Sequence, residues 1–192
     1  MTVSSNKSTN HPLDKFSFCP NCGSKCWSVN NFKSKHCEAC GFTYYANPSS
    51  ATAAFIINDR NELLAVRRKK EPAKGTLDLP GGFVDMDESA EEGIVREVLE
   101  ETGLRVTHVQ YLFSIPNIYH YSGMDIHTLD MFYRCNVEST GSVQAMDDAE
   151  EALWIPLAAV CPDDFGLLSI RQAVRRMKVE VSDIVRAMKV ER

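Results

Sequence analysis

The sequence predicts an α/β protein, a sheet with helices packed on it, preceded by a small four-cysteine module. Two C-x-x-C-G repeats predict the module. Short apolar runs between polar turns predict the strands, and an amphipathic segment crowded with glutamates predicts a helix. We divide the chain into a disordered lead-in over 1–15, the module over 16–46, a sheet domain over 50–160 and a helical segment over 161–192.

The overall composition is that of a globular protein without a membrane partner. Hydrophobic residues make up 44% of the chain and charged residues 24%, which is ordinary for a soluble domain. No apolar run approaches the ~20 residues of a membrane span, and residues 1–15 lack the apolar stretch of a signal peptide. We therefore expect a cytoplasmic protein. The net charge of −5 gives no general attraction to nucleic acid, so no such partner is expected.

Four of the seven cysteines have the spacing of a zinc site. Cys19 and Cys22 form one C-x-x-C pair, and Cys37 and Cys40 form a second. Four thiolates make a closed, tetrahedral, structural zinc site, and the glycine after each pair suits a turn with positive φ. An odd number of cysteines without an export signal disfavours a disulfide framework. We predict structural Zn²⁺ here; ordinary buried or redox cysteines are the alternative.

Predicted strands surround the glutamate-rich segment. Residues 45–50 are expected to be a linker out of the module. Alternation and turn residues then predict strands over the following ranges: 51–57, 62–68, part of 75–82, 104–115, 126–137 and 152–157. From about residue 163 onward, helical spacing and basic residues predict a helix that packs on the sheet or joins a dimer.

Residues 89–102 predict an amphipathic helix. Ser89 and Glu92 have the spacing of a capping box, and Gly103 is a natural stop. A broad apolar arc is expected to dock on the sheet; it consists of Ala90, Ile94, Val95, Val98 and Leu99. The helix can therefore pack on a core and still present a second, acidic face.

That acidic face contains Glu97, Glu100 and Glu101, which stand at i, i+3 and i+4. Like charges at this spacing destabilise a helix by a few tenths of a kcal/mol, roughly, per pair. Gly93 falls on the same face and leaves room for an approaching group. A hard divalent cation, which prefers oxygen ligands, would remove the repulsion. A solvated acidic face is the alternative.

The residues around these glutamates resemble the defining motif of Nudix hydrolases, G-x5-E-x7-R-E-U-x-E-E-x-G-U, where U is a bulky aliphatic residue. Every defined position is matched over about 23 residues. The matching residues are Gly82, Glu88, Arg96, Glu97, Val98, Glu100, Glu101, Gly103 and Leu104. So many fixed positions make the match specific.

The resemblance implies an α/β/α sandwich around a mixed sheet. It implies hydrolysis of a small-molecule nucleotide substrate, a nucleoside diphosphate linked to another group. It also implies that Glu97, Glu100 and Glu101 hold Mg²⁺ or Mn²⁺, helped by a backbone carbonyl near Gly81 or Gly82. These residues are therefore expected to be both catalytic and metal-binding.

Two further roles follow from the resemblance. Arg96 would orient the glutamates by charge-assisted hydrogen bonds, and Glu88 would brace the loop or reach the metal ions through water. The general base is expected either in the helix or on a later loop. The loop candidates are Asp148, Glu150 and Glu151, for which a solvated turn is the favoured alternative.

Candidate substrate contacts are less sharply marked. Arg67 and Lys74 lie just before the motif, where they would face substrate phosphates or simply lie in a solvated turn. Tyr119 and its neighbour Tyr121 would stack on a base. The alternative for both tyrosines is packing at the end of a strand.

A four-cysteine ribbon before a Nudix domain resembles the NADH pyrophosphatase subgroup. That subgroup carries S-Q-P-W-P-F-P-x-S, and residues 114–122 match it at Ser114, Pro116 and Ser122, with Tyr119 at an aromatic position. NADH or a similar dinucleotide is therefore one expected substrate; ADP-ribose, nucleotide sugars and diadenosine polyphosphates are the alternatives. Ribbon-bearing relatives often dimerise, which makes a homodimer one expectation.

Two rival classes differ from the hydrolase. A nucleotide-sensing Nudix domain would bind without cleaving, but such domains usually lose glutamates of the motif, and all are present here. A zinc-ribbon nucleic-acid-binding protein would need more basic residues than the acidic overall charge provides. Loss of turnover with intact ligand binding would favour the first rival, and salt-dependent RNA or DNA binding the second.

Overall fold

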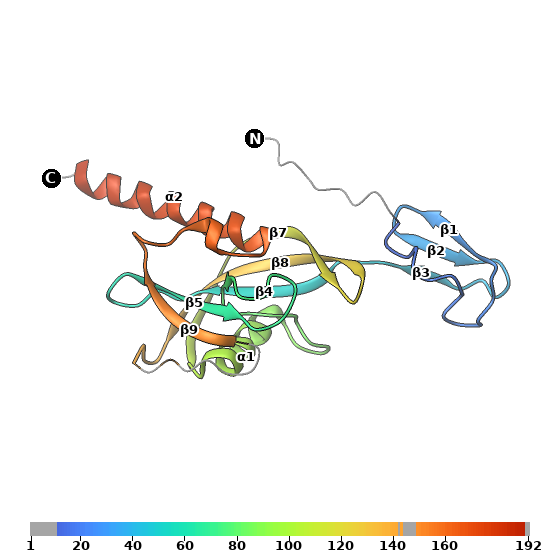
Figure 1. The fold of residues 1–192 in the computed structure, drawn as a ribbon, viewed down its shortest axis with the longest axis horizontal. Coiled ribbons are helices and arrows are strands. Elements are labelled where there is room, and N and C mark those ends of the chain that lie inside the picture. The colour runs from blue at the N-terminus through green and yellow to red at the C-terminus, as the bar shows by residue number, and fades with distance from the viewer. Residues whose placement is uncertain (1–10, 142, 144–148, 191–192) are drawn as a thin grey trace. The chain divides into compact units, whose positions relative to one another are not determined.

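The structure is a computed structural model that describes residues 11–141, 143 and 149–190 (Figure 1). By internal contacts the chain divides into two units. The first comprises the described part of Met1–Pro48 together with Ile118–His127, and the second comprises Ser49–Asn117 with the described part of Thr128–Arg192.

The first unit contains a three-stranded antiparallel sheet of order β1-β2-β3. Its strands are β1 (Trp27–Asn31), β2 (Ser34–Cys37) and β3 (Thr43–Tyr45). Leu13 is buried, and the His11 ring lies 2.9 Å from the Asn31 carbonyl. Residues 11–15 of the expected lead-in therefore form an ordered turn, while residues 1–10 lie outside the described part.

The hydrophobic cluster of this unit is very small. Cys19, Trp27 and Cys37 are buried, with Phe42 packed against them, and the rings of Trp27 and Phe42 stack with centroids 6.3 Å apart. A cluster of this size supplies little burial energy, and domains this small usually need a metal or cross-link. The four cysteines are the groups in a position to supply it.

The second unit contains two three-stranded sheets, of order β4-β8-β7 and β6-β5-β9. β4 and β8 are parallel, whereas β5 is antiparallel to both β6 and β9, so the strand pairing is mixed. The strands are β4 (Ser49–Phe55), β5 (Glu62–Arg68), β6 (Leu77–Asp78), β7 (Val106–Tyr121), β8 (Met124–Val137) and β9 (Ala149–Pro156). The expected linker over 45–50 is shorter than predicted, because β3 ends at Tyr45 and β4 begins at Ser49.

The helices are α1 (Ala90–Thr102), the short 3-10 helix η1 (Pro162–Asp164) and α2 (Leu168–Val190). The predicted capping box of α1 is present: the Ser89 hydroxyl accepts from the Glu92 N–H, and the Glu92 carboxylate accepts from the Ser89 N–H. Gly103 ends the helix with φ 71°. In the described part of the chain, no helix is both long and apolar enough to cross a membrane.

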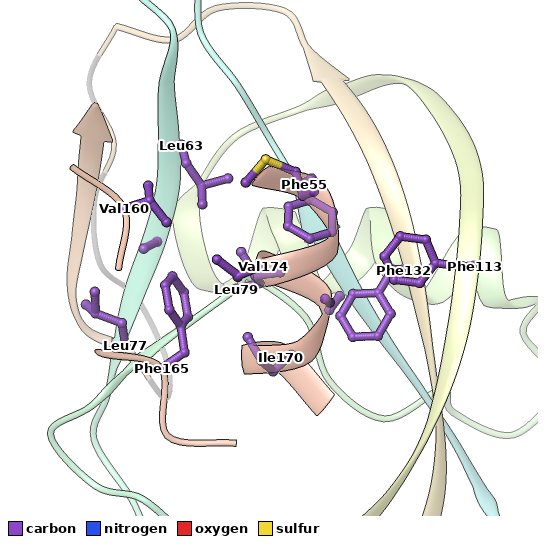
Figure 2. Packing of buried hydrophobic residues seen from close by; sticks show 14 residues of the cluster. Phe55, Leu63, Leu77, Leu79, Phe113, Phe132, Val160, Phe165, Ile170 and Val174 are labelled. Carbon is purple, nitrogen blue, oxygen red and sulfur yellow. The ribbon is translucent and has the colours of Figure 1, made fainter. Parts of the chain in front are cut away.

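Alternate residues of the central strands point to opposite helices. In β4, Ala53 and Phe55 belong to a cluster that includes Val174 of α2 (Figure 2). Their neighbours Ala54 and Ile56 belong to a second cluster, which includes residues of α1. Because strand side chains alternate between faces, the two helices cover opposite sides of the strands (Figure 1). This arrangement confirms the expected α/β/α sandwich.

The apolar arc predicted for α1 is narrower than expected. Ile94 and Val98 are fully buried, as predicted. Val95 and Leu99 are 36% and 42% exposed, so their predicted place in the core was wrong. The physical reason is that a helix docking on a flat sheet buries a stripe at i and i+4, and residues one position further round face solvent.

The two long strands β7 and β8 form a hairpin that the sequence did not predict in full. β7 continues to Tyr121, past the predicted end at residue 115. The connection is only Ser122–Gly123, with φ values of 51° and 72°. Two successive positive φ values are typical of a type I′ turn, whose twist matches that of paired strands.

Candidate metal and active site

The acidic face of α1 is more deeply placed than a solvated surface. The Glu97 side chain is 15% exposed, whereas that of Glu100 is 47% exposed. Gly82 lies against it so closely that an added Cβ would stand 2.6 Å from the Glu97 carboxyl carbon. A side chain at Gly82 would therefore displace the Glu97 carboxylate.

Arg96 connects three of the acidic residues of the motif into one network. Its Nη1 donates to Glu97 Oε1 at 2.9 Å and to Glu100 Oε2 at 3.1 Å. Its Nε and Nη2 donate to the two oxygens of Glu88 at 3.1 and 2.6 Å. Nη2 also donates to the carbonyl of Phe83 at 3.0 Å. One guanidinium thus orients three carboxylates and ties the preceding loop to the helix.

Gly93 provides the space for this arrangement. The residue is buried, and a Cβ added there would lie 3.0 Å from Glu88 Oε1. The group that approaches the gap expected at Gly93 is therefore the Glu88 carboxylate. Glu88 also accepts from the Asp85 N–H at 2.6 Å, which fits the expected role of bracing the loop.

Glu101 is held from the other side by Gly81, whose N–H donates to Glu101 Oε2 at 3.0 Å. Gly81 has φ +152°, and an added Cβ would stand 2.8 Å from the Ala53 Cα on β4. Glycine is needed for this close approach. The Gly82 carbonyl accepts from the Thr52 N–H at 2.8 Å, whereas the Gly81 carbonyl makes no hydrogen bond within the described residues. Of the two expected carbonyls, that of Gly81 is the one left for a ligand.

The surroundings of Glu88, Glu97 and Glu101 shift their pKa values in different directions. Burial raises the pKa of Glu101 to about 8, against the Gly81 N–H, which favours the charged form. Burial also raises the pKa of Glu97, although Arg96 opposes the shift. Hydrogen bonds from Arg96 and from the Asp85 N–H lower the pKa of Glu88. Glu97 and Glu101 are therefore poorly compensated anions, while Glu88 is well compensated.

This donor set fits a hard divalent cation. The available ligand atoms are carboxylate and carbonyl oxygens, the type that Mg²⁺ and Mn²⁺ prefer. The positive charge near the buried Glu97 and Glu101 does not fully compensate their carboxylates. Among the described residues, however, these glutamates do not come together as a group of three or more side chains able to hold one metal ion. Arg96 holds Glu97 and Glu100, and Gly81 holds Glu101, so their carboxylates point to separate partners.

The four predicted cysteines do form such a group. All four Sγ atoms lie within 4.8 Å of one another. Cys19 and Cys40 are 3.7 Å apart at sulfur, as are Cys22 and Cys37. A regular tetrahedron with Zn–S bonds of about 2.3 Å has S···S edges of about 3.8 Å. Two of the S···S distances thus match the edge of a zinc tetrahedron, and the others lie within 4.8 Å.

Backbone geometry and thiol acidity agree with that fit. Gly23 and Gly41 have φ 72° and 75°, as predicted, and their N–H groups donate to the Cys19 and Cys37 carbonyls. The Phe42 N–H and then the Asn21 amide lower the pKa of Cys40 to about 6. A thiolate forms readily here, and its like-charged neighbours would ionise easily only with a cation between them.

The three predicted substrate contacts, Arg67, Lys74 and Tyr119, lie in different surroundings. Arg67 donates to Glu151 Oε2 at 3.0 Å and to the Gly75 carbonyl at 2.9 Å, so its guanidinium is engaged within the protein. Lys74 is exposed on the loop between β5 and β6. Tyr119 belongs to the first unit, where it stacks on Tyr121 with ring centroids 6.3 Å apart.

The later-loop base candidates also need correction. Glu150 and Glu151 lie within strand β9 and not in a loop. Glu151 pairs across the sheet with Arg67, which explains the extended backbone there. Asp148 lies outside the described residues. The strand starts earlier than predicted because the cross-strand ion pair of Glu151 and Arg67 stabilises its first residues.

Two residues near the site were missed in the sequence. Asp78 is buried and acts electrostatically on Glu101, and Arg68 is its ion-pair partner. The signal in the sequence was Asp78, a charged residue inside the apolar stretch that leads to Gly81. Because a buried acid is rarely unpaired, a basic partner could have been expected.

Residues 47–177 match the family model described as the NUDIX domain. The chain belongs to the Nudix family. This match extends into α2, whose first turns pack in the core of the second unit. Nudix hydrolases use divalent metal ions, and the oxygen-rich face of α1 is the matching feature of this chain.

Two named relatives carry further information. The chain is 37% identical over 120 residues to an "ADP-ribose pyrophosphatase" of Methanocaldococcus jannaschii, covering 60% of this chain and 66% of the relative. It is 28% identical over 149 residues to an "NAD-capped RNA hydrolase NudC" of Pseudomonas aeruginosa, covering 76% of this chain and 49% of the relative. The chain thus spans about half to two thirds of the length of these relatives.

A solved Nudix hydrolase from Nitrosomonas europaea resembles the whole fold. The TM-score is 0.66 at 21% identity, and the match covers 85% of this chain and 90% of the other. At that identity the similarity supports the fold alone. Together with the family match, it makes this chain a Nudix hydrolase in architecture.

Proposed function

We propose that the protein hydrolyses the pyrophosphate bond of a nucleoside diphosphate linked to another group, with NADH or a similar dinucleotide as the leading substrate. The observation that carries the reaction class is the Arg96 network, which holds Glu88, Glu97 and Glu100 around one guanidinium beside Glu101. The four-cysteine module and the similarity to NudC enzymes support the dinucleotide. A cytoplasmic location and a homodimer stay predictions.

Glu97, Glu100, Glu101 and the Gly81 carbonyl are the groups that would hold Mg²⁺ or Mn²⁺. When bound, such ions neutralise phosphate charge and lower the pKa of water. Arg96 holds two of these carboxylates by hydrogen bonds, so their oxygens would have to turn from the guanidinium toward the ion when it binds. Glu88 braces the loop through the Asp85 N–H and has no need to contact the substrate.

The glutamates of α1 are the candidates for the proton acceptor. Glu151 is engaged by Arg67, which leaves the glutamates of α1 better positioned among the described residues. Lys74, exposed on its loop, is the remaining candidate for contact with a substrate phosphate.

The experiment is a hydrolysis panel with Mg²⁺ and with Mn²⁺, and with products identified by mass. It contains NADH, NAD⁺, ADP-ribose, diadenosine polyphosphates, nucleotide sugars and an NAD-capped RNA. Glu100→Gln and Glu101→Gln are the inactive controls, and Arg67→Gln tests the residue already engaged elsewhere. Release of AMP and reduced nicotinamide mononucleotide from NADH supports the leading substrate. Binding without cleavage by the native chain would contradict the hydrolase and favour a sensor.

ADP-ribose is the second candidate. The relative named for it has the higher identity of the two described above, although the match covers only 60% of this chain and leaves the substrate open. An NAD-capped RNA is a third possibility raised by the NudC relatives. The panel separates these by product: ribose 5-phosphate with AMP for the second, and a 5′-monophosphorylated RNA for the third.

A further inference from the structure

A buried ion pair lies close enough to Glu101 to act on its carboxylate. Arg68, the last residue of β5, donates from Nη1 to Asp78 Oδ2 at 2.6 Å. The two side chains are 17% and 10% exposed. Desolvating two charges commonly costs as much as their attraction returns, so a buried pair is weak support for a purely stabilising role. The remaining contacts of the pair indicate a second role.

Arg68 fixes the loop between β5 and β6. Its Nε donates to the Pro72 carbonyl at 2.7 Å. Its own N–H donates to the Thr76 carbonyl, and its carbonyl accepts from the Gly75 N–H at 2.8 Å. The loop at residues 69–76 contains three lysines. The backbone path set by Arg68 therefore determines where these positive charges stand.

Asp78 fixes the segment that leads to the glutamates. Its second oxygen, Oδ1, accepts from the Leu79 N–H at 2.8 Å. The Pro80 carbonyl then accepts from the Ala54 N–H on β4, and Gly81 donates its N–H to Glu101. Both oxygens of Asp78 are engaged, one with the arginine that shapes the loop and one with the segment that holds Glu101.

We propose that Arg68 and Asp78 are a positioning pair that holds the lysine-bearing loop at residues 69–76 in register with the Glu101 carboxylate. The inference rests on the proposed hydrolase function and names two residues that act through others. An error of 1 Å in the placement of binding groups can cost about 100-fold in rate. A rigid path from loop to carboxylate therefore explains why a charged pair is kept in a position where apolar packing would be as stable.

The electrostatic influence of the pair agrees with this role. Asp78 disfavours ionisation of Glu101 and Arg68 favours it. The two residues therefore act on the carboxylate in opposite directions. Replacing Asp78 by an uncharged residue should change both the path of the loop and the ionisation of Glu101. Replacing Arg68 by another cation should change the path of the loop alone.

Arg68→Lys tests the loop. Lysine keeps a positive charge opposite Asp78, but it lacks the planar fork that reaches both Asp78 and the Pro72 carbonyl. We expect KM for the cleaved nucleotide to rise about tenfold while kcat stays within about twofold. The Kd for Mn²⁺ alone should be unchanged. Asp78→Asn removes the charge, and we expect about tenfold increases in both KM and the Kd for Mn²⁺.

Arg60→Lys is the matched control. Arg60 donates from Nε to Glu62 Oε2 at 3.0 Å, so the substitution alters an arginine–carboxylate pair at the opposite end of β5 from Arg68. It should leave KM and Mn²⁺ affinity unchanged. If a single variant of the pair does not fold, Arg68→Met combined with Asp78→Leu removes both charges together. That double variant should fold and show the raised KM.

Hydrogen exchange separates this inference from the proposed activity. Exchange of the Gly75 and Gly81 N–H groups and binding of Mn²⁺ need no turnover. Faster exchange at both glycines in Asp78→Asn than in Arg60→Lys is expected even if none of the nucleotides in the panel is cleaved. The inference is overturned if the Arg68→Lys and Arg60→Lys variants behave alike in exchange and KM, or if Asp78→Asn binds Mn²⁺ as tightly as the native chain.

Discussion

Replacing Glu101 by glutamine should stabilise the protein when Mg²⁺ and Mn²⁺ are absent. Burial raises the pKa of Glu101 to about 8, from 4.5 for an exposed glutamate. The folded state therefore binds this proton more tightly than the unfolded state, and the free energy of unfolding falls as the pH rises from about 4.5 to about 8. Glutamine keeps an oxygen that can accept from the Gly81 N–H, but it carries no charge to bury.

The size of the effect follows from the same shift. At pH 7 the folded state keeps Glu101 mostly protonated, although pH 7 lies about 2.5 units above the pKa of 4.5 in the unfolded state; this difference corresponds to about 3 kcal/mol. At pH 5 the difference is below about 1 kcal/mol. For a chain of this length, about 3 kcal/mol raises Tm by roughly 6–12 °C. We therefore expect Glu101→Gln to melt about 6–12 °C higher than the native chain at pH 7, and to melt nearly with it at pH 5.

The assay is thermal unfolding followed by circular dichroism, in buffer freed of Mg²⁺ and Mn²⁺ but with one equivalent of Zn²⁺ verified by atomic absorption. Glu100→Gln is the control, because this side chain is 47% exposed and should shift Tm by less than about 2 °C. Added Mg²⁺ should stabilise the native chain more at pH 8 than at pH 5.5, and should not stabilise Glu101→Gln. A variant that melts below the native chain at pH 7, or by the same margin at both pH values, would refute the reasoning.

Three further predictions follow from the geometry. Arg96→Met leaves Glu88 and Glu97 without their cation and should cost about 3–5 kcal/mol of unfolding free energy, measured by urea denaturation; Mg²⁺ should restore part of it. Gly82→Ala drives a Cβ into the Glu97 carboxyl and should weaken Mn²⁺ binding at least about tenfold by calorimetry; unchanged binding would contradict the contact. Cys37→Ser should lower the zinc content and speed hydrogen exchange across residues 19–45, whereas Cys26→Ser should change neither.

The features that local sequence predicted well are those that local physics determines. The capping box of α1, its Gly103 stop and the glycine turns after each cysteine pair depend on residues within a few positions of one another. The same holds for the shared face of Glu97, Glu100 and Glu101, which helical periodicity fixes. Each of these could be inferred before any tertiary contact was known.

Other features depend on partners distant in sequence. The assignment of Glu151 to a strand follows from its pairing with Arg67, 84 residues earlier. The exposure of Val95 and Leu99 depends on how α1 lies on the sheet, and the Arg68–Asp78 pair depends on the register of β5 and β6. A helical wheel or a strand pattern cannot show which residue stands across a sheet, so these were wrong or missed.

The hydrogen bonds of Arg96 show how the acidic face remains folded before a cation arrives. The arginine neutralises Glu88 fully but shares its remaining donors between Glu97 and Glu100. Glu101 accepts a hydrogen bond from the Gly81 N–H, and burial still raises its pKa. A further positive charge would therefore stabilise the least exposed carboxylates most. A fold optimised for stability alone would not bury such a glutamate, so the position of Glu101 beside Gly81 supports the proposed cation site.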